Sequence, residues 1–222
     1  MTAQDNSINY SVADVWAAAA AAFRINQNLY IKEIEYSFDE NGVQSVKFQP
    51  NRSIVFALLA DTTQLTPADY QRGEDCRNWV IGDIMLKAIK NKLTNFDASV
   101  QKVIAVEDVF NSRKHKLELS VIPCLLSSQA RGVTRSNAEE KLRLADGIIG
   151  KIGDKVDLTI EVLNTNYSYK YNIWFVTAID QDNHSLFFSY RKTIPVGSSV
   201  KIRGTVKYHK DSTTQLNRVK VL

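Results

Sequence analysis

Basic and aromatic side chains gather in the last third of this chain. Residues 150–222 carry 11 Lys and Arg against 6 Asp and Glu, whereas residues 1–149 carry 17 against 18. Nine of the 21 aromatic residues lie in the same last third. Cations neutralise phosphates and release counterions, and aromatic rings stack on nucleobases. This composition predicts a surface that binds a single-stranded nucleic acid.

The spacing of the basic residues indicates which of them face solvent. Between Val200 and His209 apolar residues alternate with polar ones, which is the period of a strand with one buried face. The polar face carries Lys201, Arg203 and Lys207. We expect this row to attract a phosphate backbone, although an ordinary solvated face has the same pattern. Three more cations are predicted to join it: Arg191, Arg218 and Lys220.

Three aromatic residues are candidate stacking platforms: Trp174, Phe187 and Tyr190. Phe187 shares one face of its predicted strand with Arg191 and two serines, so that face is expected to be solvent-exposed. Alternation leaves Trp174 either on the solvent face or in the core. A barrel of this size also needs several aromatic residues to fill its interior, so core packing is the alternative for part of the set.

Five short strands are predicted after Gly150, with turn residues between them. They are residues 155–163, 171–179, 185–191, 200–209 and 217–221. Gly204 lies inside the fourth strand, where a glycine usually marks a bulge or a tight bend. Five strands in so short a stretch predict a small, highly curved barrel.

Four segments of this region resemble the OB-fold segments of bacteriophage replication and single-stranded-DNA-binding proteins. They are Ile152–Val156, Phe175–Asn183, Val200–His209 and Thr214–Val221. The resemblance implies an OB-fold barrel, a ligand that crosses its second and third strands, and a place in phage-type DNA replication or recombination. It implies a binding protein rather than an enzyme. Single-stranded DNA is the expected partner and RNA stays open, because no residue reports on the 2′-hydroxyl.

Residues 1–146 are predicted to form a first domain that mixes helices and strands and is mainly helical. Residues 147–222 form the second domain, so the chain is predicted to be an α+β protein. The expected elements are helices at 12–26, 66–91, 96–106 and 136–145, a short helix or buried segment at 52–59, a hairpin of strands 29–38 and 43–48, a strand at 116–126 interrupted by Pro123, and a loop at 129–134. Thr66, Pro67 and Asp69 are a strong helix start. The helix that follows is expected to form the core of this domain.

Catalytic chemistry is not indicated. The chain has no phosphate-binding or dinucleotide-binding glycine motif, and its three histidines lack the spacing of metal ligands. We therefore expect no catalytic residue, no metal and no cofactor. Glu74, Asp75 and Asp83 on one predicted helix leave a carboxylate-dependent nuclease as a weak alternative. The stronger alternative is an adaptor that docks replication or transcription proteins without coating a strand.

The cysteines and the hydropathy of the chain indicate the cellular compartment in which we expect it. Cys76 and Cys124 are far apart in sequence and lack the spacing of a second pair, so we expect free thiols in a reducing cytoplasm, that of the host cell if the chain is viral. No apolar run reaches the roughly 18 residues that a membrane helix needs, and no membrane partner is expected.

Overall fold

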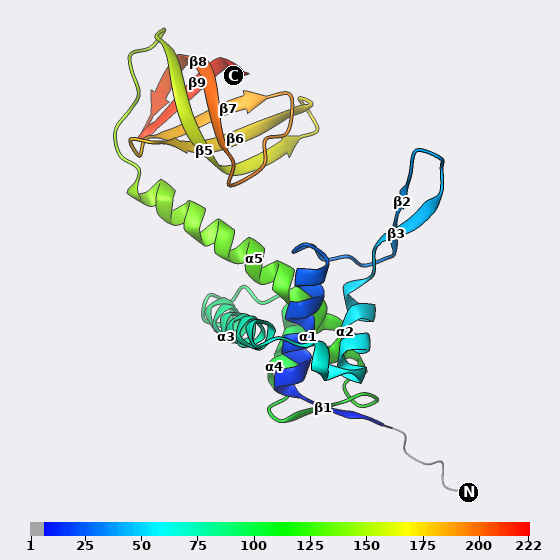
Figure 1. The fold of residues 1–222 in the computed structure, drawn as a ribbon. Coiled ribbons are helices and arrows are strands. Elements are labelled where there is room, and N and C mark those ends of the chain that lie inside the picture. Colours follow the sequence, from blue (N-terminus) through cyan, green and yellow to red (C-terminus); the bar gives the residue numbers. More distant parts are fainter. Residues whose placement is uncertain (1–6) are drawn as a thin grey trace, which may run out of the picture. The chain divides into compact units, whose positions relative to one another are not determined.

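The computed structural model describes residues 7–222 and divides between Arg131 and Gly132 into two compact units. We call residues 7–131 the helical unit and residues 132–222 the barrel unit. The first contains helices and a short β-hairpin, and the second contains a closed five-stranded barrel (Figure 1). This confirms the predicted α+β class. The division falls inside helix α5.

The helical unit is built around helix α1. Every residue of α1 from Val15 to Phe23 is buried. A helix that is apolar all round must lie inside a core, and this one is packed against α2 and α3 (Figure 1). The elements in chain order are β1 (Asn9–Ser11), α1 (Val12–Ile25), β2 (Glu35–Phe38), β3 (Gln44–Phe48), α2 (Asn51–Ala60), the 3-10 turn η1 (Thr62–Gln64), α3 (Pro67–Ile89), α4 (Asn95–Ile104), β4 (Val109–Asn111) and α5 (Lys116–Leu144).

The predicted start of helix α3 is confirmed as a capping box. The Thr66 hydroxyl accepts a hydrogen bond from the backbone N–H of Asp69, and the Asp69 carboxylate accepts one from the backbone N–H of Thr66. The same carboxylate receives two hydrogen bonds from the Arg24 guanidinium, at 2.9 and 2.8 Å. Asp69 therefore joins the end of α1 to the start of α3.

The pKa of Asp69 makes the stability of the helical unit pH-dependent. Burial alone raises this pKa, but the hydrogen bonds from Arg24 and Thr66 outweigh burial and lower it to about 2. An Asp in the unfolded chain has a pKa of about 3.9, so the stabilisation is complete above about pH 4 and is lost as the pH falls toward about 2. We expect Asp69→Asn to cost up to about 2 kcal/mol of unfolding free energy at neutral pH. Urea denaturation should show that this deficit shrinks on acidification; a deficit independent of pH would contradict the ion pair.

Three predictions for the end of the helical unit are wrong: a strand at 116–126, a loop at 129–134 and a helix start near Ser136. The chain forms one continuous helix, α5, from Lys116 to Leu144, with Pro123 inside it. Leu119, Ile122 and Leu126 recur at helical spacing and are buried against the core of the helical unit. The burial of this face stabilises the helix, although Pro123 has no N–H to donate to the turn before it.

The predicted hairpin is confirmed by the antiparallel pairing of β2 with β3, with Tyr36 opposite Val46 and Ser37 opposite Ser45. Asp39 stabilises the turn, because its carboxylate accepts hydrogen bonds from the backbone N–H groups of Asn41 and Val43. Nearly all side chains of the two strands are exposed. The hairpin projects from the helices of its unit (Figure 1).

The barrel unit confirms all five predicted strands. They are β5 (Lys155–Ser168), β6 (Ile173–Asp180), β7 (Ser185–Tyr190), β8 (Ser199–Lys210) and β9 (Thr213–Val221). The barrel closes in the order β5-β6-β7-β9-β8, with β7 and β9 parallel and the other pairs antiparallel. This arrangement agrees with the predicted OB-fold barrel. The ladder of β8 with β9 is irregular between Arg203 and Thr205, at the glycine expected to mark a bend.

Among residues 7–222, no helix combines the length and the apolar character needed to cross a membrane.

Candidate nucleic-acid interface

A groove lies where the ends of β7 and β9 meet the start of β6. Its volume is about 600 Å³, and we call it the basic groove. It is lined by Ile173, Ser189, Tyr190, Arg191, Lys192, Arg218, Val219, Lys220 and Val221. Four of these described residues are cationic and none is acidic. Four of the predicted site residues, Tyr190, Arg191, Arg218 and Lys220, are therefore brought together here.

Within residues 7–222, the cations of the basic groove are not paired with an anion. In the part of the chain that the structure describes, no carboxylate forms an ion pair with Arg191, Lys192, Arg218 or Lys220. Their charges have the same sign and share one concave surface, so the groove has a positive potential. It is suited to a ligand with closely spaced negative charges.

A bulge in β9 places Arg218 and Lys220 on the same exposed surface. Strict alternation from the buried Leu216 would turn both cations inward. Arg218 instead has a φ of 53°, and the register with β8 shifts between Asn217 and Lys220. The extra residue reverses the alternation, so Val219 packs on the barrel core while the two cations are exposed.

A pair of aromatic rings continues the surface of the groove along β6 and β7. Phe175 and Phe187 are stacked, with ring centroids 5.7 Å apart and an angle of 22° between the rings. Both are half-buried on the outer face of the barrel, where Phe187 was expected. Ser189 lines the groove and is the register partner of Phe175, so the groove and the ring pair share one face.

Comparisons of the chain with protein-family models, with curated proteins and with solved structures found no match. The functional assignment therefore rests on the residues and geometry of the chain itself.

The other two predicted platforms lie on the core side of the barrel. Trp174 and Tyr190 are direct partners across β6 and β7, and both pack against the barrel core. Trp174 also contacts Tyr167, at 5.1 Å between ring centroids. Alternation explains the placement, since Trp174 shares its face with the buried Val176. Tyr190 differs from Trp174 in that it also lines the basic groove.

The predicted row on β8 is exposed, but its central member is already paired. Arg203 donates two hydrogen bonds to the Asp157 carboxylate, both at 2.6 Å, and these hydrogen bonds hold the pKa of Asp157 below its ordinary value. Asp157 is the register partner of Arg203 on β5. Lys201 and Lys207 have exposed side chains and form no ion pair with any described residue. The row therefore offers two available cations rather than three.

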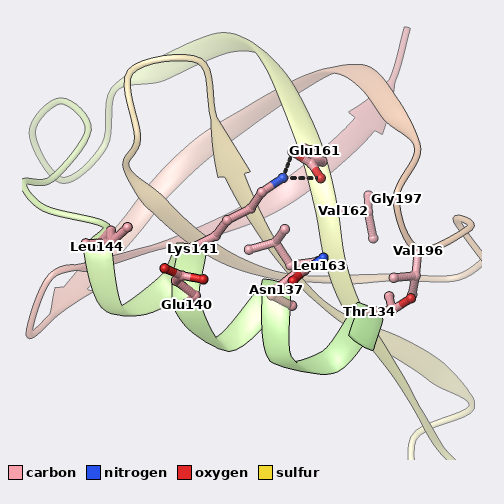
Figure 2. Close-up of a pocket in the computed structure, with 11 residues that line it drawn as sticks. Thr134, Asn137, Glu140, Lys141, Leu144, Glu161, Val162, Leu163, Val196 and Gly197 are labelled. Carbon is pink, nitrogen blue, oxygen red and sulfur yellow. Dashed lines mark hydrogen bonds and ion pairs between the residues drawn. The ribbon is translucent and has the colours of Figure 1, made fainter. Parts of the chain in front are cut away.

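A second cavity, of about 350 Å³, lies between the end of α5 and strand β5. Figure 2 shows Lys141 reaching from α5 to Glu161 on β5, where its Nζ lies 2.6 Å from each carboxylate oxygen. Glu140 also lines this cavity. A site with two carboxylates and a paired lysine is poorly suited to a polyanion, which favours the basic groove as the ligand site.

Asp83 of the nuclease alternative, and a group of acidic residues in a barrel turn, form interactions that stabilise the fold. Asp83 pairs with Lys87 at 2.7 Å, and Lys87 also reaches Asp97, which joins α3 to α4. Asp180, Asp182 and His184 lie close together in the turn between β6 and β7. There the Asp180 carboxylate accepts hydrogen bonds from the backbone N–H groups of the other two residues, as a turn requires.

Lys192 lines the basic groove and Phe175 stacks on Phe187, but neither is among the site residues predicted from sequence. Lys192 follows Arg191 directly, but it lies past the end of the predicted strand, where alternation assigns no face. Phe175 could have been found from the burial of Val176 and Ala178, because their neighbours in a strand must point outward. From sequence alone, both faces of β6 carry apolar residues, so alternation did not show which face is buried.

Proposed function

We propose that the barrel unit binds single-stranded nucleic acid, with DNA as the expected ligand, in a sequence-tolerant way. The observation that carries this proposal is the basic groove itself: four cations without ion-pair partners among the described residues, on one face with the stacked rings of Phe175 and Phe187. The groove provides charge for the phosphates, and the rings provide a flat apolar surface for the bases.

The arrangement supports binding without sequence preference. Stacking uses the π-face that every base presents, and contacts to phosphates carry no sequence information. A single strand presents unpaired bases beside its backbone, whereas a duplex hides them in its stack. We infer a role in a process that exposes single strands, replication or recombination, in keeping with the phage proteins that the barrel segments resemble.

Fluorescence anisotropy with a labelled oligothymidine and a matched duplex tests the proposal. We expect the single strand to bind more tightly than the duplex and to be released by salt. If all four groove cations contact phosphates, the slope of log affinity against log salt should be about −3, because each single-strand phosphate contributes about −0.7. No binding to the single strand at low salt would exclude the proposal and favour the adaptor. Equal affinity for both ligands would indicate electrostatic attraction alone.

Substitution of Phe187 separates stacking from charge. We expect Phe187→Ala to weaken single-strand binding about 5- to 150-fold, since stacking contributes roughly 1–3 kcal/mol per base. The salt slope should not change, because no cation is removed. Phe187→Leu keeps an apolar side chain without a π-face and should bind as weakly as the alanine variant. Phe187→Trp should bind as tightly as the wild type. A leucine variant that binds normally would contradict stacking.

A further inference from the structure

Two apolar surfaces of the helical unit are exposed. The first is on the hairpin and consists of Tyr36, Phe38, Val43 and Val46; we call it the hairpin surface. Phe38 is 68% exposed, the highest value among these four. Tyr36 and Val46 are direct partners across the two strands, so they lie on one face of the hairpin. A two-stranded sheet without a covering layer is only marginally stable in water, so this face is expected to be covered.

The second surface lies at the end of helix α3 and consists of Met85, Leu86 and Ile89; we call it the helix surface. Ile89 lies four positions after Met85 and three after Leu86, so its side chain is a neighbour of both on the helix. Ile89 is 79% exposed, although isoleucine is among the residues most often buried. Leu93 and Phe96, which follow in the chain, are also exposed.

The charges around the two surfaces are opposite. Around the hairpin surface the exposed Glu33, Glu35, Asp39 and Glu40 outnumber Lys32 and Lys47. Next to the helix surface, Lys90 and Lys92 are exposed and form no ion pair with any residue from 7 to 222. Each apolar surface therefore has a charged border that attracts the other and repels a copy of itself.

We propose that the hairpin surface of one copy of this chain docks on the helix surface of a second copy. The opposite charges select this head-to-tail contact over hairpin against hairpin, where acidic borders would face each other. Because the two surfaces differ, the contact is heterologous, and each bound copy keeps one free surface for the next. The assembly does not involve the basic groove.

Sedimentation velocity of the full chain without nucleic acid, over a concentration series at low salt, tests the proposal. We expect the weight-average sedimentation coefficient to rise with concentration. Phe38→Ser removes the most exposed apolar side chain of the hairpin surface, and Ile89→Ser removes the most exposed one of the helix surface. Each variant alone should sediment as a monomer. An equal mixture should form a one-to-one dimer, because the intact hairpin of one variant meets the intact helix of the other.

The remaining outcomes decide against the proposal. A wild-type chain that stays monomeric at every concentration would overturn it. An Ile89→Ser variant that associates like the wild type would show that the hairpin pairs with itself or with another surface. Circular dichroism provides the folding control. As a second measurement, Glu40→Lys and Lys90→Glu should each weaken association, and a chain with both changes should recover it; failure of the double variant to recover would contradict the charge pairing.

Discussion

Replacing Gly73 by alanine is expected to destabilise the helical unit by at least about 3 kcal/mol, at the upper end of the usual cost of overpacking. Gly73 lies on α3 where that helix crosses α1. A Cβ atom there would lie 2.6 Å from the carbonyl carbon of Trp16, 2.7 Å from the carbonyl oxygen of Trp16 and 2.8 Å from the backbone nitrogen of Ala17. These are backbone atoms of a buried helix, so the two helices must separate to admit the methyl group.

Gly82 on the same helix provides the matched control. No atom lies within 4 Å of a Cβ added at Gly82, so Gly82→Ala should raise stability by about 0.5–1 kcal/mol through helix propensity. Hydrogen exchange measured by mass spectrometry can follow the two units separately. For Gly73→Ala we expect lost protection in α1 and α3 and unchanged protection in the barrel strands. Equal stability of the two variants would contradict the close approach of α1 and α3.

Reversing two charges in the basic groove is expected to weaken single-strand binding by at least about a hundredfold at low salt, because cation–phosphate contacts supply most of the affinity of sequence-tolerant binding. The variant is Arg191→Glu combined with Arg218→Glu. Arg191 follows the end of β7 and Arg218 lies on β9, both line the same groove, and no described carboxylate pairs with either. The slope of log affinity against log salt should become shallower by about 1.4 or more, since each lost contact contributes about 0.7.

Arg203→Gln is the control for that variant. Arg203 is an exposed cation of the same barrel, but Asp157 already occupies its guanidinium. We expect less than a twofold change in affinity and the wild-type salt slope. If Arg203→Gln weakens binding as much as the groove variant does, the phosphates follow β8 rather than the groove.

The barrel could be predicted from sequence because each of its strands has a local signal. Alternation of polar and apolar residues identified the strands, and turn residues identified the boundaries. The outward face of Phe187 followed from the same period. The pairing of Arg203 with Asp157 could not be predicted in this way. It depends on the register between β5 and β8, and the sequence of a single strand does not determine that register.

Prediction failed where packing outweighed local preference. The segment around Pro123 has β-forming residues and a proline, yet the burial of Leu119, Ile122 and Leu126 holds it in a long helix. The core helix is the alanine-rich α1 rather than the longer α3, which exposes Met85, Leu86 and Ile89 at its end. Small side chains give a weak hydropathy signal, but they permit close helix approach, as at Gly73.

The central position of α1 has a consequence for synthesis of the chain on the ribosome. Strand β1, which directly precedes α1, pairs with β4, and Asn9 lies opposite Asn111 in this pairing. Helix α1 also packs in the same core as Leu126 of α5. Because α1 precedes α2, α3 and α5 in the chain, its apolar surface stays uncovered on the ribosome until those helices have been synthesised. Chain closure over so many residues is entropically costly. Co-translational folding of the helical unit is thus expected to be late, with α1 exposed to chaperones until α5 has emerged.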